Sequence, residues 1–138
     1  VATVTTFGQP KVTNFEGANS LNHLDIKRIV LPNDLVPLIP PFDPLDIQNL
    51  DIYWHAGKEL ILLKDKQYTI VEGVDAMLRA TKFTQEPLNE GNLVNHKMSI
   101  YRQAVNKKTP LAKQVAYENN FNLFNLFGGD TPEPATSQ

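Results

Sequence analysis

IKRIVLPNDLVPLIPP, residues 26–41, is the stretch from which the fold can be inferred. A β-branched apolar run ends at Pro32, and Asn33 and Asp34 then turn the chain into an apolar, proline-rich segment. Such a run, closed by turn residues, predicts a buried strand over Lys27–Leu31. Asp34 then follows the carboxyl end of that strand, where α/β sheets and barrels carry catalytic residues. A carboxylate on a proline-stiffened loop suits the orientation of a histidine; the alternative is an Asn-Asp turn without chemistry.

Composition limits the class of protein. The chain has 138 residues, of which 41% are hydrophobic and 20% charged, as expected for one ordinary domain or a large piece of one. Its formal net charge of -2 gives no sign of electrostatic capture of nucleic acid or of an anionic membrane. It contains no cysteine, which excludes disulfides and thiol catalysis, and no apolar run approaches the length of a membrane span.

The strand pattern predicts the α/β class. Val1–Phe7 alternates small, β-branched and aromatic residues without charge, which indicates a central strand. The segment between it and Lys27–Leu31 is long enough for a helical crossover, so the two strands should be parallel. Two further apolar runs, 59–63 and 68–71, flank a short polar turn and predict a hairpin that forms an antiparallel edge of the sheet.

Helical spacing appears after residue 92. We expect Asn92 to cap a helix whose apolar stripe comprises Val94, Met98, Tyr101 and Val105. His96 would point nearly opposite that stripe, either into solvent or into a cleft. Thr109-Pro110 predicts the start of a second helix over Leu111–Asn119. The phenylalanines of 121–127 would pack back on the domain or bind a lipid surface or partner, and residues 128–138 have the composition of a disordered tail.

Asp34 and His96 are the candidate catalytic pair. Their order is that of the α/β-hydrolase triad, Ser…Asp/Glu…His, in which the imidazole activates the serine and the carboxylate orients the imidazole. The only serines are Ser20, Ser99 and Ser137, and none lies in a Gly-x-Ser-x-Gly motif. The sequence therefore offers an acid and a base without a convincing nucleophile.

Four motifs in order resemble those of the class 3, or fungal-type, triacylglycerol lipases, as far as about Tyr101. They are Phe7-Gly8-Gln9-Pro10-Lys11-Val12, Asn33-Asp34-Leu35-Val36-Pro37-Leu38-Ile39-Pro40-Pro41, Tyr53-Trp54-His55-Ala56-Gly57-Lys58-Glu59 and His96-Lys97-Met98-Ser99-Ile100-Tyr101. The resemblance implies that Asp34 is the triad acid and His96 the base. His55 matches a histidine of that family which we do not expect to be catalytic. Thr13-Asn14 departs from the family, where a glycine usually precedes the asparagine.

The resemblance also implies how the domain is organised. Residues 1–127 would be the C-terminal part of an α/β-hydrolase domain, with helices on the faces of its sheet. The nucleophilic serine, the lid and the oxyanion-hole loop would lie in an N-terminal half that precedes this chain or is a separate polypeptide. The expected reaction is hydrolysis of lipid esters without a cofactor or a metal, with contact to a lipid interface. Leu35, Val36, Leu38 and Ile39 would line part of the acyl site. The implied location is secreted, with a cytoplasmic location as the alternative.

The sequence is compatible with two other interpretations. The chain could be an inactive binding or structural module that kept this part of the hydrolase fold. A metal site built from His23, His55 and His96 with nearby aspartates is disfavoured, since no two of these histidines have the spacing of metal ligands.

Overall fold

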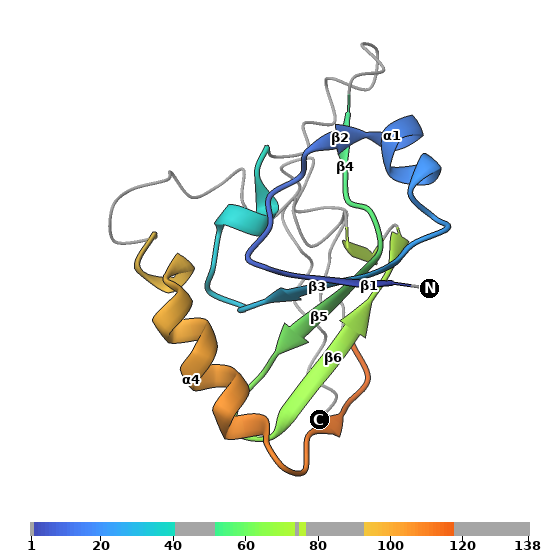
Figure 1. The fold of residues 1–138 in the computed structure, drawn as a ribbon. Coiled ribbons are helices and arrows are strands. Elements are labelled where there is room, and N and C mark those ends of the chain that lie inside the picture. The colour runs from blue at the N-terminus through green and yellow to red at the C-terminus, as the bar shows by residue number, and fades with distance from the viewer. Residues whose placement is uncertain (1, 41–51, 74, 77–92, 118–138) are drawn as a thin grey trace, which may run out of the picture.

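The computed structural model describes residues 2–40, 52–73, 75–76 and 93–117 (Figure 1). Its main sheet has the strand order β1-β3-β5-β6-β7. These strands are β1 (Thr3–Phe7), β3 (Asp25–Val30), β5 (Lys58–Leu62), β6 (Gln67–Val71) and β7 (Lys113–Gln114). A separate antiparallel pair joins β2 (Thr13–Asn14) to β4 (Tyr53–Trp54). The helical elements are α1 (Phe15–Ser20), the 3₁₀ turns η1 (Val36–Leu38) and η4 (Val94–His96), and α4 (Met98–Lys108). The fold is therefore a mixed sheet with a few helices, loosely α/β.

The first two predicted strands are present and parallel. β1 pairs with β3, and β3 pairs in parallel with β5, so the three carboxyl ends lie at one end of the sheet. The prediction that the first strand is central was wrong for the described residues, because β1 lies at the edge of the sheet. Val4 and Phe7 are 38% and 37% exposed. A lack of charge is compatible with burial, but it does not show which neighbours cover a strand.

The predicted hairpin is confirmed, although it does not form the edge of the sheet. β5 and β6 are antiparallel, and β7 pairs in parallel with the outer side of β6. The amides of Lys113 and Val115 donate to the carbonyls of Lys66 and Tyr68. The helix expected from residue 111 is therefore absent from 111–117, since these amides instead satisfy the open side of β6.

One face of the sheet carries the larger part of the described core. Val30, Ile61, Val71 and Ala76 form a buried cluster, against which Tyr117 packs. On the same face, Arg28 and Glu59 stand opposite each other on β3 and β5. Arg28 Nη1 lies 2.9 Å from Glu59 Oε2, and the two side chains are 1% and 0% exposed.

α4 covers the other face of the sheet. Val105 of α4 lines an open pocket of about 220 Å³ together with Ile29 and Leu60 of the sheet. At the end of the helix, Lys108 Nζ donates to the carbonyls of Leu63 and Asp65, both at 2.6 Å, and so ties α4 to the β5–β6 turn. Burial holds the pKa of Lys108 below its ordinary value.

Several predictions fall on residues that the structure does not describe. They are the cap at Asn92, the phenylalanine cluster of 121–127 and the tail of 128–138. Within the described ranges, no helix has the length and apolarity needed to cross a membrane.

Candidate functional site

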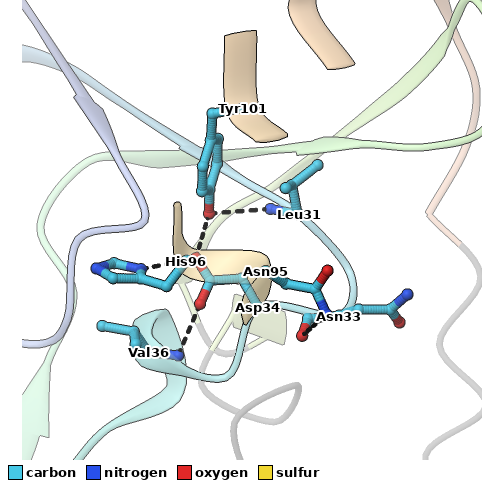
Figure 2. Close-up of polar contacts among 7 residues, drawn as sticks. All are labelled: Leu31, Asn33, Asp34, Val36, Asn95, His96 and Tyr101. Atoms are coloured by element: carbon cyan, nitrogen blue, oxygen red, sulfur yellow. Dashed lines mark hydrogen bonds and ion pairs between the residues drawn. The ribbon is translucent and has the colours of Figure 1, made fainter. Parts of the chain in front are cut away.

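The two residues predicted as the catalytic acid and base meet in the structure. His96 Nδ1 lies 3.0 Å from Asp34 Oδ2, although 62 positions separate the residues in the sequence (Figure 2). The Asp34 carboxylate is fully buried, whereas the His96 side chain is 39% exposed. A buried carboxylate beside a partly open imidazole is the arrangement of an acid that orients a base.

Local hydrogen bonds position both partners. The Asp34 amide donates to the carbonyl of Leu31 just past β3, so the acid lies at the carboxyl end of that strand as predicted. His96 ends the η4 turn, and Asn95 Nδ2 donates to the carbonyl of Asn33 at 3.3 Å. This last contact joins the segment of the base to the segment of the acid.

The direction predicted for the His96 side chain was based on one continuous helix, and the structure does not contain that helix. η4 is a separate 3₁₀ turn, and α4 begins at Met98 with Lys97 as its N-cap. The expected apolar stripe is also incomplete, because Val94 and Met98 are 46% and 61% exposed. Tyr101 is the member of the stripe that is fully buried. An angle calculated for one continuous helix loses its meaning where the backbone leaves the helix between two turns.

Tyr101 is a site residue that sequence reasoning assigned only to packing. Its hydroxyl donates to Asp34 Oδ2 at 2.5 Å and accepts from the Leu31 amide at 3.3 Å (Figure 2). Phe7 packs edge-on against its ring, with centroids 5.9 Å apart. The signal in the sequence was the H-x-M-x-x-Y motif, in which the tyrosine is polar as well as aromatic.

Three donors hold the Asp34 carboxylate. Tyr101 and His96 share Oδ2, and the Val36 amide donates to Oδ1 at 3.0 Å. Because the ionised carboxylate only accepts, Nδ1 of a neutral His96 carries the proton and Nε2 is the acceptor. Nε2 is therefore the nitrogen that can take a proton from another group.

Gly8, which directly follows β1, lies beside the Asp34 and His96 side chains. Its φ is +61°, and a Cβ at this position would lie 2.8 Å from Asp34 Oδ2 and from His96 Nδ1. Its amide donates to the carbonyl of Ile29 at 2.9 Å. Only glycine combines this backbone conformation with so close an approach.

The four residues expected at the acyl site adjoin Asp34. Leu38 is buried, and Leu35 and Ile39 pack against it, while Val36 is half-buried and supplies the amide to Asp34. The pocket under α4 is lined by other residues.

The remaining histidines lie apart from the pair. His55 is buried and bonds to the carbonyl of Pro37, whereas exposed His23 bonds to the carbonyl of Ser20. Among the residues described here, no group of three or more His, Asp or Glu side chains could hold a metal ion. Among the described residues, neither Ser20 nor Ser99 forms a hydrogen bond with His96. Ser20 Oγ instead donates to the carbonyl of Gly17.

A scan against protein-family models gave no match, and a search of curated proteins also gave none.

Gly8→Ala should weaken the Asp34–His96 hydrogen bond, because the added methyl group has no room beside the two side chains. Gly73→Ala is the matched control, since Gly73 has a φ of +58° and open space around a Cβ. We expect Gly8→Ala to lose the low-field NMR resonance of the His96 Nδ1 proton and Gly73→Ala to keep it. A resonance unchanged in Gly8→Ala would show that the close approach has no consequence.

Tyr101→Phe should lower the free energy of unfolding by about 1–3 kcal/mol, because a buried hydrogen bond to a charged group is lost. Urea denaturation measures this loss. Tyr53→Phe is the control, since Tyr53 is 47% exposed and its change should be small. Equal stability of the two variants would contradict a structural role for the Tyr101 hydroxyl.

Proposed function

We propose that this chain supplies the acid and the base of a Ser-His-Asp triad that hydrolyses carboxylic ester bonds of lipids. The observation that supports this most strongly is the 3.0 Å contact between His96 Nδ1 and the buried Asp34 carboxylate. In this proposal the serine comes from the N-terminal half of the same hydrolase, as an upstream segment or a separate chain.

The reaction follows from the proton positions. The serine hydroxyl attacks the ester carbonyl carbon while His96 Nε2 takes its proton, and Asp34 stabilises the imidazolium. The tetrahedral intermediate expels the alcohol, which receives that proton from Nε2. Water then attacks the acyl-enzyme, again giving its proton to Nε2, and the returned proton regenerates the serine as the carboxylic acid leaves.

The free edge of β1 supports the proposal that a serine-bearing segment docks beside it. β1 is uncharged and parallel to β3, and the described residues place no strand on its outer side. Such an open edge favours pairing with another strand. A parallel strand there would end beside Gly8, where a Cβ would lie 2.8 Å from His96 Nδ1, so a turn following that strand could carry a hydroxyl toward Nε2.

Apolar side chains around the base favour lipid substrates. Leu93, Val94 and Met98 flank His96 in the sequence, with exposed fractions of 45%, 46% and 61%. Next to Asp34, Leu35, Val36, Leu38 and Ile39 supply an apolar segment that can form part of an acyl site. These two segments would also allow contact with a lipid interface.

The triad is tested by Asp34→Asn and His96→Ala in the complete protein, that is, this chain together with its serine-bearing part. We expect kcat for a short-chain ester to fall about 10⁴-fold for the first change and about 10⁶-fold for the second. Exposed His23 provides the control, and His23→Ala should keep full activity. Near-normal turnover in either triad variant would refute the assignment, and a complete protein without esterase activity would favour an inactive binding module.

The docking edge is tested by Val4→Lys, which places a charge in the middle of β1. If a partner strand covers this edge, the affinity for a separately expressed N-terminal half should fall at least about tenfold, because the charge would be desolvated. Val12→Lys, outside β1 and at a side chain 62% exposed, should bind normally. Sedimentation measures both affinities, and equal binding of the two variants would exclude the β1 edge.

A further inference from the structure

A second histidine makes a buried contact to the segment that holds the acid. His55 lies between β4 and β5 and is 8% exposed. Its Nε2 is 2.6 Å from the carbonyl oxygen of Pro37, a residue 18 positions earlier. Because a carbonyl oxygen only accepts, Nε2 carries a proton and His55 is the donor.

The backbone around His55 is firmly held, so this donor is in a fixed place. The carbonyl of Ala56 accepts from Arg28 Nε at 2.9 Å, and Arg28 is itself paired with Glu59 in the core. Gly57 has a φ of +73° and lies so close to Ile26 that a Cβ would collide with it. The segment that carries His55 is thus held against β3 by a hydrogen bond and by close backbone packing.

The acceptor belongs to a short element with little stability of its own. η1 is a three-residue 3₁₀ turn, and isolated turns of this length are not stable without tertiary contacts. The same turn places the Val36 amide on Asp34 Oδ1. The far end of the segment is held separately, by the Lys11 amide on the Ile39 carbonyl and Lys11 Nζ on the Pro40 carbonyl.

We propose that His55 is a positioning residue for the acid. By donating to the Pro37 carbonyl it fixes η1, which keeps the Val36 amide on Asp34 and so orients the carboxylate toward His96. This inference rests on the proposed hydrolase function for its effect on rate, but its effect on the Asp34–His96 contact stands independently of that function.

Three substitutions in the complete protein test the proposal. His55→Gln can present an amide N–H near the position of Nε2, whereas His55→Asn has a shorter side chain and His55→Leu has no donor. We expect the Leu and Asn variants to lose between about 10- and 100-fold in kcat with little change in KM, because a small misplacement of catalytic groups has effects of this size. The Gln variant should stay within about threefold of the parent.

The His96 Nδ1 proton resonance is the second measurement, and it does not depend on turnover. It should broaden or vanish in the Leu and Asn variants and persist in the Gln variant, with Asp34→Asn identifying the signal by its loss. Folded Leu and Asn variants with the parent resonance would overturn the proposal, as would a Gln variant impaired as strongly as the Leu variant. If the resonance follows this pattern while the parent lacks esterase activity, the proposed function fails and the role of His55 stands.

Discussion

The buried carboxylate of Asp34 is the feature on which the arrangement of the site depends. Removing an ionised carboxylate from water is costly unless hydrogen bonds replace those to the solvent. Its donors come from the η1 turn, the η4 turn and α4, as Val36, His96 and Tyr101. These elements must therefore converge at the end of β3 for the carboxylate to be accommodated. The same hydrogen bonds that satisfy the charge also fix the direction in which Asp34 faces the imidazole.

The register of the sheet beneath the site is specified by a buried ion pair. Arg28 and Glu59 face each other on β3 and β5, and a slip of one residue would move one partner to the opposite face. Removing either partner would leave an uncompensated buried charge, so the register of the two strands is strongly specified. That register also determines how the end of β3 is placed relative to the start of β5, which directly follows the segment containing His55. The position of the acid is thus determined partly by residues that never approach it.

Much of the sheet and the acid–base pair could be predicted from the sequence. The helix expected from Leu111 and the role of Tyr101 were predicted wrongly or missed because both depend on distant residues. Strands β1 and β3 and the β5–β6 hairpin follow from alternation and turn residues that lie within the elements themselves. The pairing of Asp34 with His96 came from the order of residue types and from the family resemblance. The helix expected from Leu111 was wrong because its amides bond to β6, a neighbour that local propensity does not include. The role of Tyr101 was missed for the same reason, since its partner lies 67 positions away.

The exposed imidazole and the open strand edge have one explanation within the proposed enzyme. A triad histidine works in a site from which water is largely excluded, yet the His96 side chain is 39% exposed. Among the described residues no strand covers the outer side of β1, and Gly8, which follows β1, lies so near the imidazole that a Cβ there would be 2.8 Å from His96 Nδ1. A single strand docked along β1 would satisfy the edge and shield the base together, and its end would lie where the nucleophile is needed. In the proposed enzyme, one additional strand would therefore complete the site and cover the edge of the sheet at the same place.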